Sequence, residues 1–183
     1  MAVKVPAGTR ALVVTVSDGV AAGTRQDEAG AALSERLVGH GFAVDRANVP
    51  DERPGIEAAL SVGVADHALV ITTGGTGLTP RDVTPQATLA VIEYEVPGLA
   101  EAMRAFGRAH TPMADLSRGV VGVLKGTLIV NAPGSPRAAL ECLEALEPTL
   151  EHALETLGGP FDHGAAGAGH AAHPDLPDPE LPA

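Results

Sequence analysis

The sequence predicts an α/β protein with a mostly parallel central sheet covered by helices. Short apolar runs rich in β-branched residues alternate with segments whose apolar residues recur every three or four positions. This alternation is typical of parallel sheets with helices on both faces. The chain has 183 residues, of which 45% are apolar, so it is long enough to form one domain with a sizeable core.

The first half of the chain contains three predicted strands, at 10–17, 42–49 and 67–73. The first and third, RALVVTVS and HALVITT, are continuously apolar and indicate buried strands, whereas FAVDRANV alternates like a half-buried one. Helices are predicted between them, over 27–41 and 56–66, with PDERPG as a break before the second.

The second half repeats this order around two helix starts. Thr84 is suited to the N-cap of a helix and Pro85 to its first position, and Pro97-Gly98 ends that helix before another begins. The run GTLIVNAPGSP predicts a strand, a tight loop and a helix beginning at Ser135-Pro136. Leucines at spacings of three or four extend this last helix, in which Pro148 predicts a kink or a break.

Composition narrows the class of protein. The net charge of −11 argues against nucleic-acid binding, which needs a basic surface. No run of 18 apolar residues indicates a membrane span, and the N-terminus lacks a signal peptide. The single cysteine, Cys142, excludes an intrachain disulfide and lies in a helical apolar pattern, so we expect a buried structural thiol in a cytoplasmic protein.

The chain divides into a folded body at 1–159 and a tail at 160–183. The tail is rich in Gly, Ala and Pro and has no periodicity, which predicts disorder. Its three histidines are more simply explained as solvated side chains than as metal ligands: His163, His170 and His173.

Three predicted strand ends carry unusual loops, SDGVAAGT, TGGTGLTPRD and NAPGSP. Ligands of α/β sheets bind at the carboxyl ends of the strands, so these loops predict one composite site. In the second loop, the backbone N–H groups of Gly74, Gly75 and Gly77 precede a helix start and favour an anion such as phosphate. The loop matches neither the P-loop nor the GxGxxG fingerprint, and a plain turn is the alternative.

Carboxylates accompany this predicted anion site. Asp82 follows the glycines, and an acid beside a phosphate site requires a divalent cation between them. Asp51, at the end of the strand 42–49, can approach the same edge, and the two together predict a Mg²⁺ site. A turn role for Asp82 and helix capping by Asp51 are the alternatives, and Asp18 admits both kinds of role.

Two further segments offer polar groups. Ser135 follows an exposed glycine at a helix start, where an ordinary capped helix is the simpler interpretation. Ser117-Arg118 offers a hydroxyl and a guanidinium that could bind an oxyanion or a polar ring. A single Ser-Arg pair does not by itself indicate a binding site.

The order of these segments resembles one family. VTVSDGVAAGT, VPDE, TTGGTGLTPRDVTPQAT, PGLAEAMR, LSRGVVG and TLIVNAPGSP together are similar to the MogA/MoaB family of molybdenum-cofactor biosynthesis, whose domain also occurs in gephyrin. The resemblance covers about residues 10–157. It implies a three-layer α/β/α sandwich that assembles as a homotrimer or hexamer.

The resemblance also implies an activity: adenylylation of molybdopterin by Mg²⁺ and ATP, with release of pyrophosphate and hand-over to a MoeA-type molybdate insertase. The family's two essential aspartates correspond to Asp51 and Asp82, which would hold Mg²⁺. Its molybdopterin-binding segments correspond to Gly74, Gly75, Thr76, Gly77, Thr84, Ser117, Arg118, Pro133, Gly134 and Ser135. Its nucleotide side corresponds to Ser17, Asp18, Gly23 and Asp27.

The chain departs from the family pattern at Asp27-Glu28-Ala29-Gly30, where a serine is common at the third position. NAPGSP also replaces the commoner NLPGSP. The competing functions are a molybdopterin-binding or assembly protein without transferase activity and a CinA-type pyrophosphatase, whose loop reads GGLGPTxDD. The insertase itself is much longer than this chain.

Overall fold

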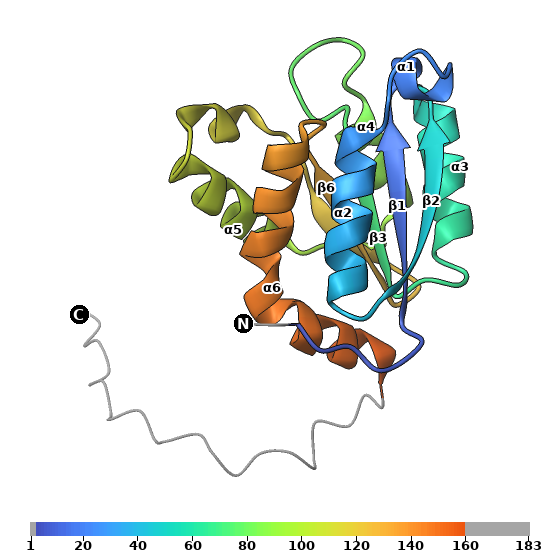
Figure 1. Cartoon of the computed structure of the whole chain (residues 1–183), viewed down its shortest axis with the longest axis vertical. Coiled ribbons are helices and arrows are strands. Elements are labelled where there is room, and N and C mark those ends of the chain that lie inside the picture. Colours follow the sequence, from blue (N-terminus) through green and yellow to red (C-terminus); the bar gives the residue numbers. More distant parts are fainter. Residues whose placement is uncertain (1–2, 160–183) are drawn as a thin grey trace, which may run out of the picture.

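The computed structural model describes residues 3–159 (Figure 1), so the predicted tail lies outside the described residues. In chain order the elements are β1 (Arg10–Val16), α1 (Asp18–Ala21), α2 (Glu28–Gly39), β2 (Ala43–Val49), α3 (Arg53–Gly63), β3 (Leu69–Thr73), α4 (Thr84–Val91), β4 (Tyr94–Glu95), α5 (Pro97–Arg108), the 3₁₀ helix η1 (Pro112–Leu116), β5 (Val121–Leu124), β6 (Thr127–Ala132) and α6 (Pro136–Gly158).

The strands form one sheet in the order β2-β1-β3-β6-β5-β4. The first four are parallel, with Thr15 of β1 opposite Thr73 of β3 and Thr73 opposite Ala132 of β6. The strands β5 and β4 continue the sheet in antiparallel pairing. The predicted mostly parallel sheet is therefore confirmed, with an antiparallel extension at one edge.

Helices cover both faces of the sheet and give the expected three layers. On one face, α2, α5 and α6 enclose a core that includes Leu33, Met103 and Leu146. On the other, α3 and α4 enclose a second core that includes Ile56 and Ala87. Figure 1 shows α2 and α6 lying side by side across the first face. Alternate residues of β1 and β3 face opposite cores, because side chains of a strand alternate between its faces.

Two predicted helix boundaries are wrong. The helix α3 begins at Arg53 inside the stretch interpreted as a break, because Pro54 lies in its first turn, where a missing N–H costs nothing. The helix α4 begins at Thr84 itself, with Val83 as N-cap and no side-chain cap. The α1 turn, capped by the Ser17 hydroxyl, was not predicted.

The largest difference lies between α4 and α5. The helix predicted to reach Pro97 ends at Val91, and Tyr94–Glu95 form β4 against β5. Backbone pairing fixes this segment: Glu93 N donates to Val123 O and Val96 N donates to Val121 O. Its partner β5 was not predicted either, since both strands are short and each depends on the other.

The last helix passes through Pro148 without a break. It runs continuously from Pro136 to Gly158, with Ser135 as its N-cap and the Ser135 hydroxyl accepting from Ala138 N at 3.2 Å. Of the two outcomes predicted for Pro148, the break is absent, whereas the helix does change direction in its C-terminal half (Figure 1).

Glu147 joins α6 to α2 through an ion cluster in which Glu147 and His40 are nearly buried and Arg36 is partly exposed. Its carboxylate lies 2.6 Å from the Arg36 guanidinium and 2.8 Å from His40 Nε2. Burial opposes the charge, but hydrogen bonds from His40 and Arg36 outweigh it and lower the pKa of Glu147. Because the pKa is lower in the folded state, the stabilisation is complete above the unfolded-state pKa and is lost as the pH falls through the folded-state pKa.

We therefore expect Glu147→Gln to lower the free energy of unfolding at pH 7 by roughly 1–2 kcal/mol. The variant should also lose less stability than the wild type between pH 6 and acid, because the titrating group is gone. Urea unfolding at several pH values measures both effects. Glu155→Gln is the control, since Glu155 is exposed on the same helix. Equal acid dependence in the wild type and Glu147→Gln would contradict the assignment.

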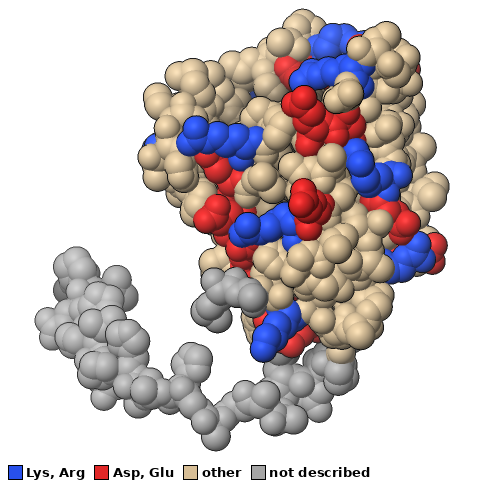
Figure 2. All heavy atoms as spheres, in the orientation of Figure 1, with Lys and Arg blue, Asp and Glu red and all other residues tan. Residues whose placement is uncertain are grey.

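Charged side chains are interspersed on the face drawn in Figure 2, where basic and acidic groups lie next to one another. This face therefore lacks the continuous basic surface on which nucleic-acid binding depends. Among residues 3–159, no helix combines the length and apolar character that crossing a bilayer requires.

Candidate active site

A cavity of about 300 Å³ lies where the chain order of the sheet reverses. From β1, the chain continues through α2 to β2 on one side, whereas β3 is reached through α3 and lies on the other side of β1. Ligands of α/β sheets bind at such switch points. We call this cavity the first cavity. Its lining comes from the ends of β1 and β3, the start of α2 and the turn before α6: Thr15, Val16, Ser17, Val20, Arg25, Gln26, Asp27, Glu28, Ala29, Asp51, Thr73, Gly74, Gly75, Gly134, Ser135 and Pro136.

A second cavity of about 330 Å³ opens beside it, and Ser135 lines both. Its floor includes Thr76 and Gly77 of the glycine loop. Its remaining lining comes mainly from α5, η1 and α6 and is largely apolar: Met103, Arg104, Gly107, Thr111, Met113, Ala114, Leu116, Ser117, Pro133, Ala138, Glu141 and Cys142. The loop from Gly74 to Gly77 thus borders both cavities, as the sequence predicted for one composite site.

Close backbone packing explains two of the loop glycines. Gly74 has φ of +109°, and a Cβ there would collide with the carbonyl oxygen of Val16. Gly75 has φ of +63°, and its Cβ would collide with Thr84 Oγ1. Both conformations are in the region that favours glycine. The loop can therefore approach β1 and α4 only because these positions lack side chains.

Thr84 has a different role from the two predicted for it. It is fully buried and lines neither cavity. Its hydroxyl donates to Gly74 O at 2.9 Å, and its backbone N donates to Gly75 O at 3.1 Å. Thr84 therefore holds the glycine loop through these two hydrogen bonds. It does not cap α4, and it lies outside the lining of both cavities.

Asp51 reaches the first cavity from the loop after β2. Its Oδ2 accepts from Asp18 N at 2.8 Å, and its own N donates to Asp18 Oδ1 at 3.0 Å. The capping alternative is therefore wrong, because the N-cap residue of α3 is Glu52 and no side chain caps that helix, whereas the Asp51 carboxylate accepts from Asp18 N. Asp51 Oδ1 lies 3.5 Å from the Cβ position of Gly75, beside the glycine loop.

Asp18 connects Asp51 to the far side of the loop. Its carboxylate lies 2.6 Å from the Arg81 guanidinium. The Arg81 hydrogen bond, followed by the one from Asp51 N, lowers the pKa of Asp18. Asp18 lines neither cavity, so its contacts fix the positions of Asp51 and the loop.

Asp82 closes the other end of the glycine loop. Its Oδ2 accepts from Thr79 N at 2.7 Å and lies 3.0 Å from the Cβ position of Gly77. Burial opposes ionisation, but hydrogen bonds from Thr79 and Gly77 and the positive charge of Arg118 together lower the pKa of Asp82. The turn alternative is thus present in the structure, and it holds an ionised carboxylate against the loop.

The two carboxylates fit a divalent cation only in part. Among the described residues no group of three or more metal-binding side chains gathers. Mg²⁺ commonly takes one or two carboxylates and completes its shell with water and substrate phosphates. Asp51 lines the first cavity beside Gly75, whereas Asp82 lies beside Gly77 and lines neither cavity, so each would supply one carboxylate to such a shell from its own end of the loop.

Arg118 holds the loop through three hydrogen bonds. Its Nε donates to Gly77 O at 2.7 Å, its terminal nitrogen to Asp82 O at 2.5 Å, and its backbone N to Thr76 O at 3.0 Å. Its guanidinium was predicted to face a ligand, and the structure uses it as a brace. Ser117 lines the second cavity together with Thr76 and Gly77, and its role at a ligand stays a prediction.

The turn before α6 brings the third predicted loop to the site. Pro133 O accepts from Thr73 Oγ1 at 2.7 Å, which ties the turn to the end of β3. The Cβ position of Gly134 lies 3.3 Å from Gly74 Cα, so the turn packs directly on the glycine loop. Ser135 caps α6 and remains exposed between the two cavities.

The predicted nucleotide residues divide into two groups. Ser17 and Asp27 line the first cavity, whereas Gly23 and Asp18 do not. Asp27 caps α2 by accepting from Gly30 N at 2.9 Å and forms an ion pair with Arg46. Gly23 has φ of +70° and shapes the loop between α1 and α2.

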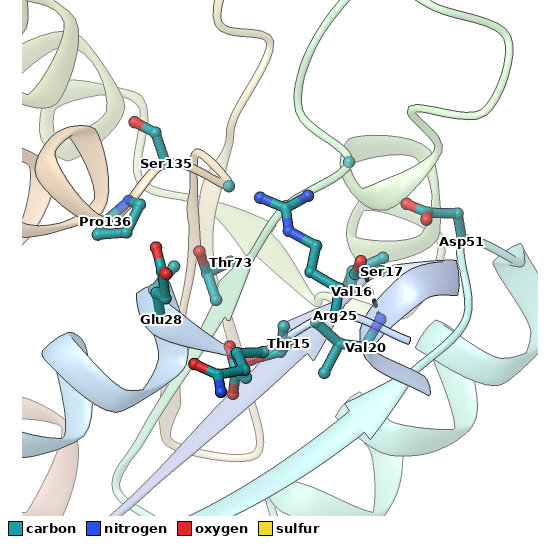
Figure 3. A pocket seen from close by; sticks show the side chains of 16 residues that line it. Thr15, Val16, Ser17, Val20, Arg25, Glu28, Asp51, Thr73, Ser135 and Pro136 are labelled. Carbon is teal, nitrogen blue, oxygen red and sulfur yellow. Dashed lines mark hydrogen bonds between the residues drawn. The ribbon is translucent and has the colours of Figure 1, made fainter. Parts of the chain in front are cut away.

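Sequence reasoning missed Thr15, Arg25, Glu28 and Thr73 as lining residues. Figure 3 shows the Arg25 side chain reaching toward the middle of the first cavity, with Thr73 on one side and Asp51 on the other. Among the described residues, no acidic side chain forms an ion pair with Arg25. A basic residue in the Gly-rich loop after a buried strand was the available signal, since such a loop reaches the strand ends.

Cys142 lies in the wall of the second cavity, where burial and the nearby Glu141 charge raise the pKa of its thiol to about 12. The predicted inert thiol is consistent with this value, because the thiolate is the reactive form. We expect iodoacetamide at pH 8 to modify the native protein at least about tenfold more slowly than the urea-unfolded protein. Mass spectrometry after timed quenching measures both rates, and equal rates would contradict a suppressed thiolate.

A family model described as "Probable molybdopterin binding domain" matches residues 12–152 of this chain. The chain belongs to this family. The matched range includes the lining of both cavities and every element from β1, apart from its first two residues, to most of α6.

Curated relatives agree with this membership. The molybdopterin adenylyltransferase of Haemophilus influenzae is 45% identical over 141 residues, covering 74% of this chain and 71% of the relative. A "Molybdenum cofactor biosynthesis bifunctional protein" of Synechococcus elongatus is 42% identical over 160 residues, covering 86% of this chain. This chain spans 50% of the length of that bifunctional relative.

A solved structure supports the fold of this molybdopterin-binding domain. The molybdopterin biosynthesis enzyme MoaB of Thermus thermophilus superposes with a TM-score of 0.77 at 49% identity, over 84% of this chain and 99% of that one. At this identity and coverage the three-layer arrangement predicted from the resemblance is confirmed.

Proposed function

We propose that this protein is a molybdopterin adenylyltransferase, which uses Mg²⁺ and ATP to adenylylate molybdopterin in molybdenum-cofactor biosynthesis. The observation that carries the proposal is the pair of adjacent cavities that share Ser135 and border one glycine loop. A transfer between two substrates needs two binding sites whose reacting groups meet at one point. The Haemophilus relative named for this activity supports the choice.

The first cavity suits the nucleotide and the second suits the pterin. The first has a polar floor and an arginine, Arg25, whose charge can stabilise phosphates. The second has apolar walls that include Met103 and Leu116, with Thr76 and Ser117 at its polar side. A flat heterocycle with polar edges requires this combination of surfaces.

In the proposed reaction, a terminal phosphate oxygen of molybdopterin attacks the α-phosphorus of ATP. A new P–O bond forms, the bond from the α-phosphorus to the bridging oxygen breaks, and its electron pair leaves with pyrophosphate. The backbone of Gly74 to Gly77 aligns the phosphates between the cavities, and Arg25 faces the developing charge. Asp51 and Asp82 would hold Mg²⁺, which supplies charge neutralisation when bound.

We also propose a cytoplasmic homotrimer or hexamer that delivers its product to a MoeA-type insertase. Support for assembly comes from three exposed apolar side chains, of which Leu78 lies in the loop after β3 and Met113 and Leu116 lie in η1 at the second cavity. Support for a reducing compartment comes from the single cysteine, Cys142.

The purified protein should convert molybdopterin and ATP labelled on the α-phosphate into labelled adenylyl-molybdopterin and unlabelled pyrophosphate. Omission of Mg²⁺ should stop the reaction. Binding of the pterin without product would instead support a molybdopterin carrier. Cleavage of a nucleotide without transfer to the pterin would support a CinA-type pyrophosphatase.

A further inference from the structure

The Thr15 hydroxyl is buried without a hydrogen-bond partner. Thr15 is 5% exposed near the end of β1, and its Oγ1 is the one fully buried side-chain nitrogen or oxygen in the described part of the chain that has none. Other buried threonine hydroxyls donate to backbone carbonyls, including those of Thr73, Thr84 and Thr127. A buried polar group without a partner lowers stability, so Thr15 Oγ1 calls for an explanation.

Packing does not explain the hydroxyl. Thr15 lies in the run ALVVTV, whose other positions are apolar and buried. Valine has the same branched shape and would fill the position without an unpaired oxygen. The hydroxyl is therefore dispensable for the strand itself.

Thr15 lines the first cavity, and its buried hydroxyl lies near a second polar group, the Asp27 carboxylate. Figure 3 shows Thr15 at the floor of this cavity, below Arg25. The Cβ position of Gly30 lies 2.5 Å from Thr15 Oγ1 and is also in contact with the Asp27 carboxylate. The Thr15 hydroxyl and the Asp27 carboxylate therefore flank the same point, the Cβ position that Gly30 leaves without a side chain.

The two groups have complementary requirements. Thr15 Oγ–H can donate, and the Asp27 carboxylate can only accept. Asp27 is held in place by Gly30 N and by Arg46, and its side chain is 9% exposed. A ligand hydroxyl satisfies both, because it accepts from Thr15 and donates to Asp27. An amino group of a base can only donate, and a ring nitrogen without a proton can only accept.

We propose that Thr15 and Asp27 bind one hydroxyl of the nucleotide ribose at the floor of the first cavity. The proposal rests on the proposed function, which places the nucleotide in that cavity. Thr15 then gains in the complex the hydrogen bond that it lacks in the free protein. Its role is to bind and position the nucleotide, with the phosphates directed toward Ser135.

Thr15→Val separates this role from a structural one. In the free protein it should unfold at the same temperature as the wild type or higher, because an unpaired oxygen is removed. Its Kd for α,β-methylene ATP, measured by calorimetry, should rise about tenfold, as expected for one lost hydrogen bond in a dry site. Affinity for molybdopterin should not change.

Thr127→Val is the matched control. Thr127 is also a buried strand threonine, but its hydroxyl donates to His67 O at 2.6 Å outside both cavities. It should unfold at a lower temperature and bind the ATP analogue as tightly as the wild type does. The two variants thus predict opposite patterns of stability and affinity.

Deoxynucleotides identify the ligand group. One of 2′-deoxy-ATP and 3′-deoxy-ATP should bind the wild type about tenfold more weakly than ATP, and Thr15→Val should prefer ATP over that analogue by a smaller factor, because only the contact with Asp27 remains. The proposal is overturned if Thr15→Val binds the nucleotide as tightly as the wild type does. It is also overturned if the affinity lost through Thr15→Val and the affinity lost through removal of the ribose hydroxyl are fully additive. If the wild type binds no nucleotide, the proposed function fails together with this assignment, whereas wild-type binding without a Thr15 effect removes this assignment alone.

Discussion

Asp82→Asn is expected to lower the rate of adenylyl transfer at least about 100-fold while leaving molybdopterin affinity within about twofold. Asparagine keeps an oxygen that accepts from Thr79 N, the contact that Asp82 Oδ2 makes at 2.7 Å. The glycine loop should therefore keep its conformation. The lost property is the negative charge beside Gly77, which the proposed Mg²⁺ requires.

Single-turnover kinetics with α-labelled ATP and calorimetry with molybdopterin measure the two quantities separately. The lowered pKa of Asp82 also predicts how the wild-type transfer rate depends on pH. A carboxylate with a lowered pKa stays ionised until the pH falls below the ordinary range for aspartate. The contribution of Asp82 to the wild-type rate should therefore persist through that range and disappear only at more acidic pH.

The control is Asp45→Asn, which also removes one carboxylate charge. Asp45 lies in β2 and pairs with Arg10 at 2.7 Å, away from both cavities. Its activity should stay within about twofold of the wild type. Retention of more than a tenth of the wild-type rate by Asp82→Asn would show that the charge is not required for transfer.

Gly74→Ala is expected to lower the free energy of unfolding by about 3 kcal/mol or more. At φ of +109°, an L side chain is strained whatever the space, and the added methyl group would also collide with the Val16 carbonyl oxygen. Backbone at the end of β1 would have to move. Because Gly74 borders the first cavity and packs on Gly134, nucleotide affinity should fall as well.

Gly55→Ala makes the same chemical change in the helix α3. A Cβ there meets no atom within 4 Å, and alanine favours helices over glycine by about 1 kcal/mol, so this variant should be as stable as the wild type or more so. Urea unfolding at equal temperature compares the three proteins. A stability of Gly74→Ala within about 1 kcal/mol of the wild type would contradict the strain argument.

The sequence was informative where local patterns decide the structure. Continuous apolar runs located β1 and β3, and Ser135-Pro136 located the start of α6. Parallel strands end at one edge, so the sequence alone predicted that the three loops lie together. The short strands β4 and β5 could not, since two residues at Tyr94–Glu95 become a strand only by pairing with a distant segment.

Individual side chains were harder to assign than loops. Arg118 and Thr84 were predicted to face a ligand, yet both brace the glycine loop through contacts with residues distant in the chain. Thr15 looked like one more residue of a buried strand. Its unpaired oxygen becomes evident only when every neighbouring donor and acceptor is placed in space.

The two cavities are built from different parts of the chain, apart from the loop and the turn that they share. The first cavity, which we propose for the nucleotide, uses the ends of the parallel strands, whereas the apolar wall of the second cavity uses α5, η1 and α6. Substitutions in Met103, Met113 or Leu116 can therefore reshape one binding site without altering the other. Such modularity gives the domain a route to new acceptors in evolution or engineering, with nucleotide activation retained.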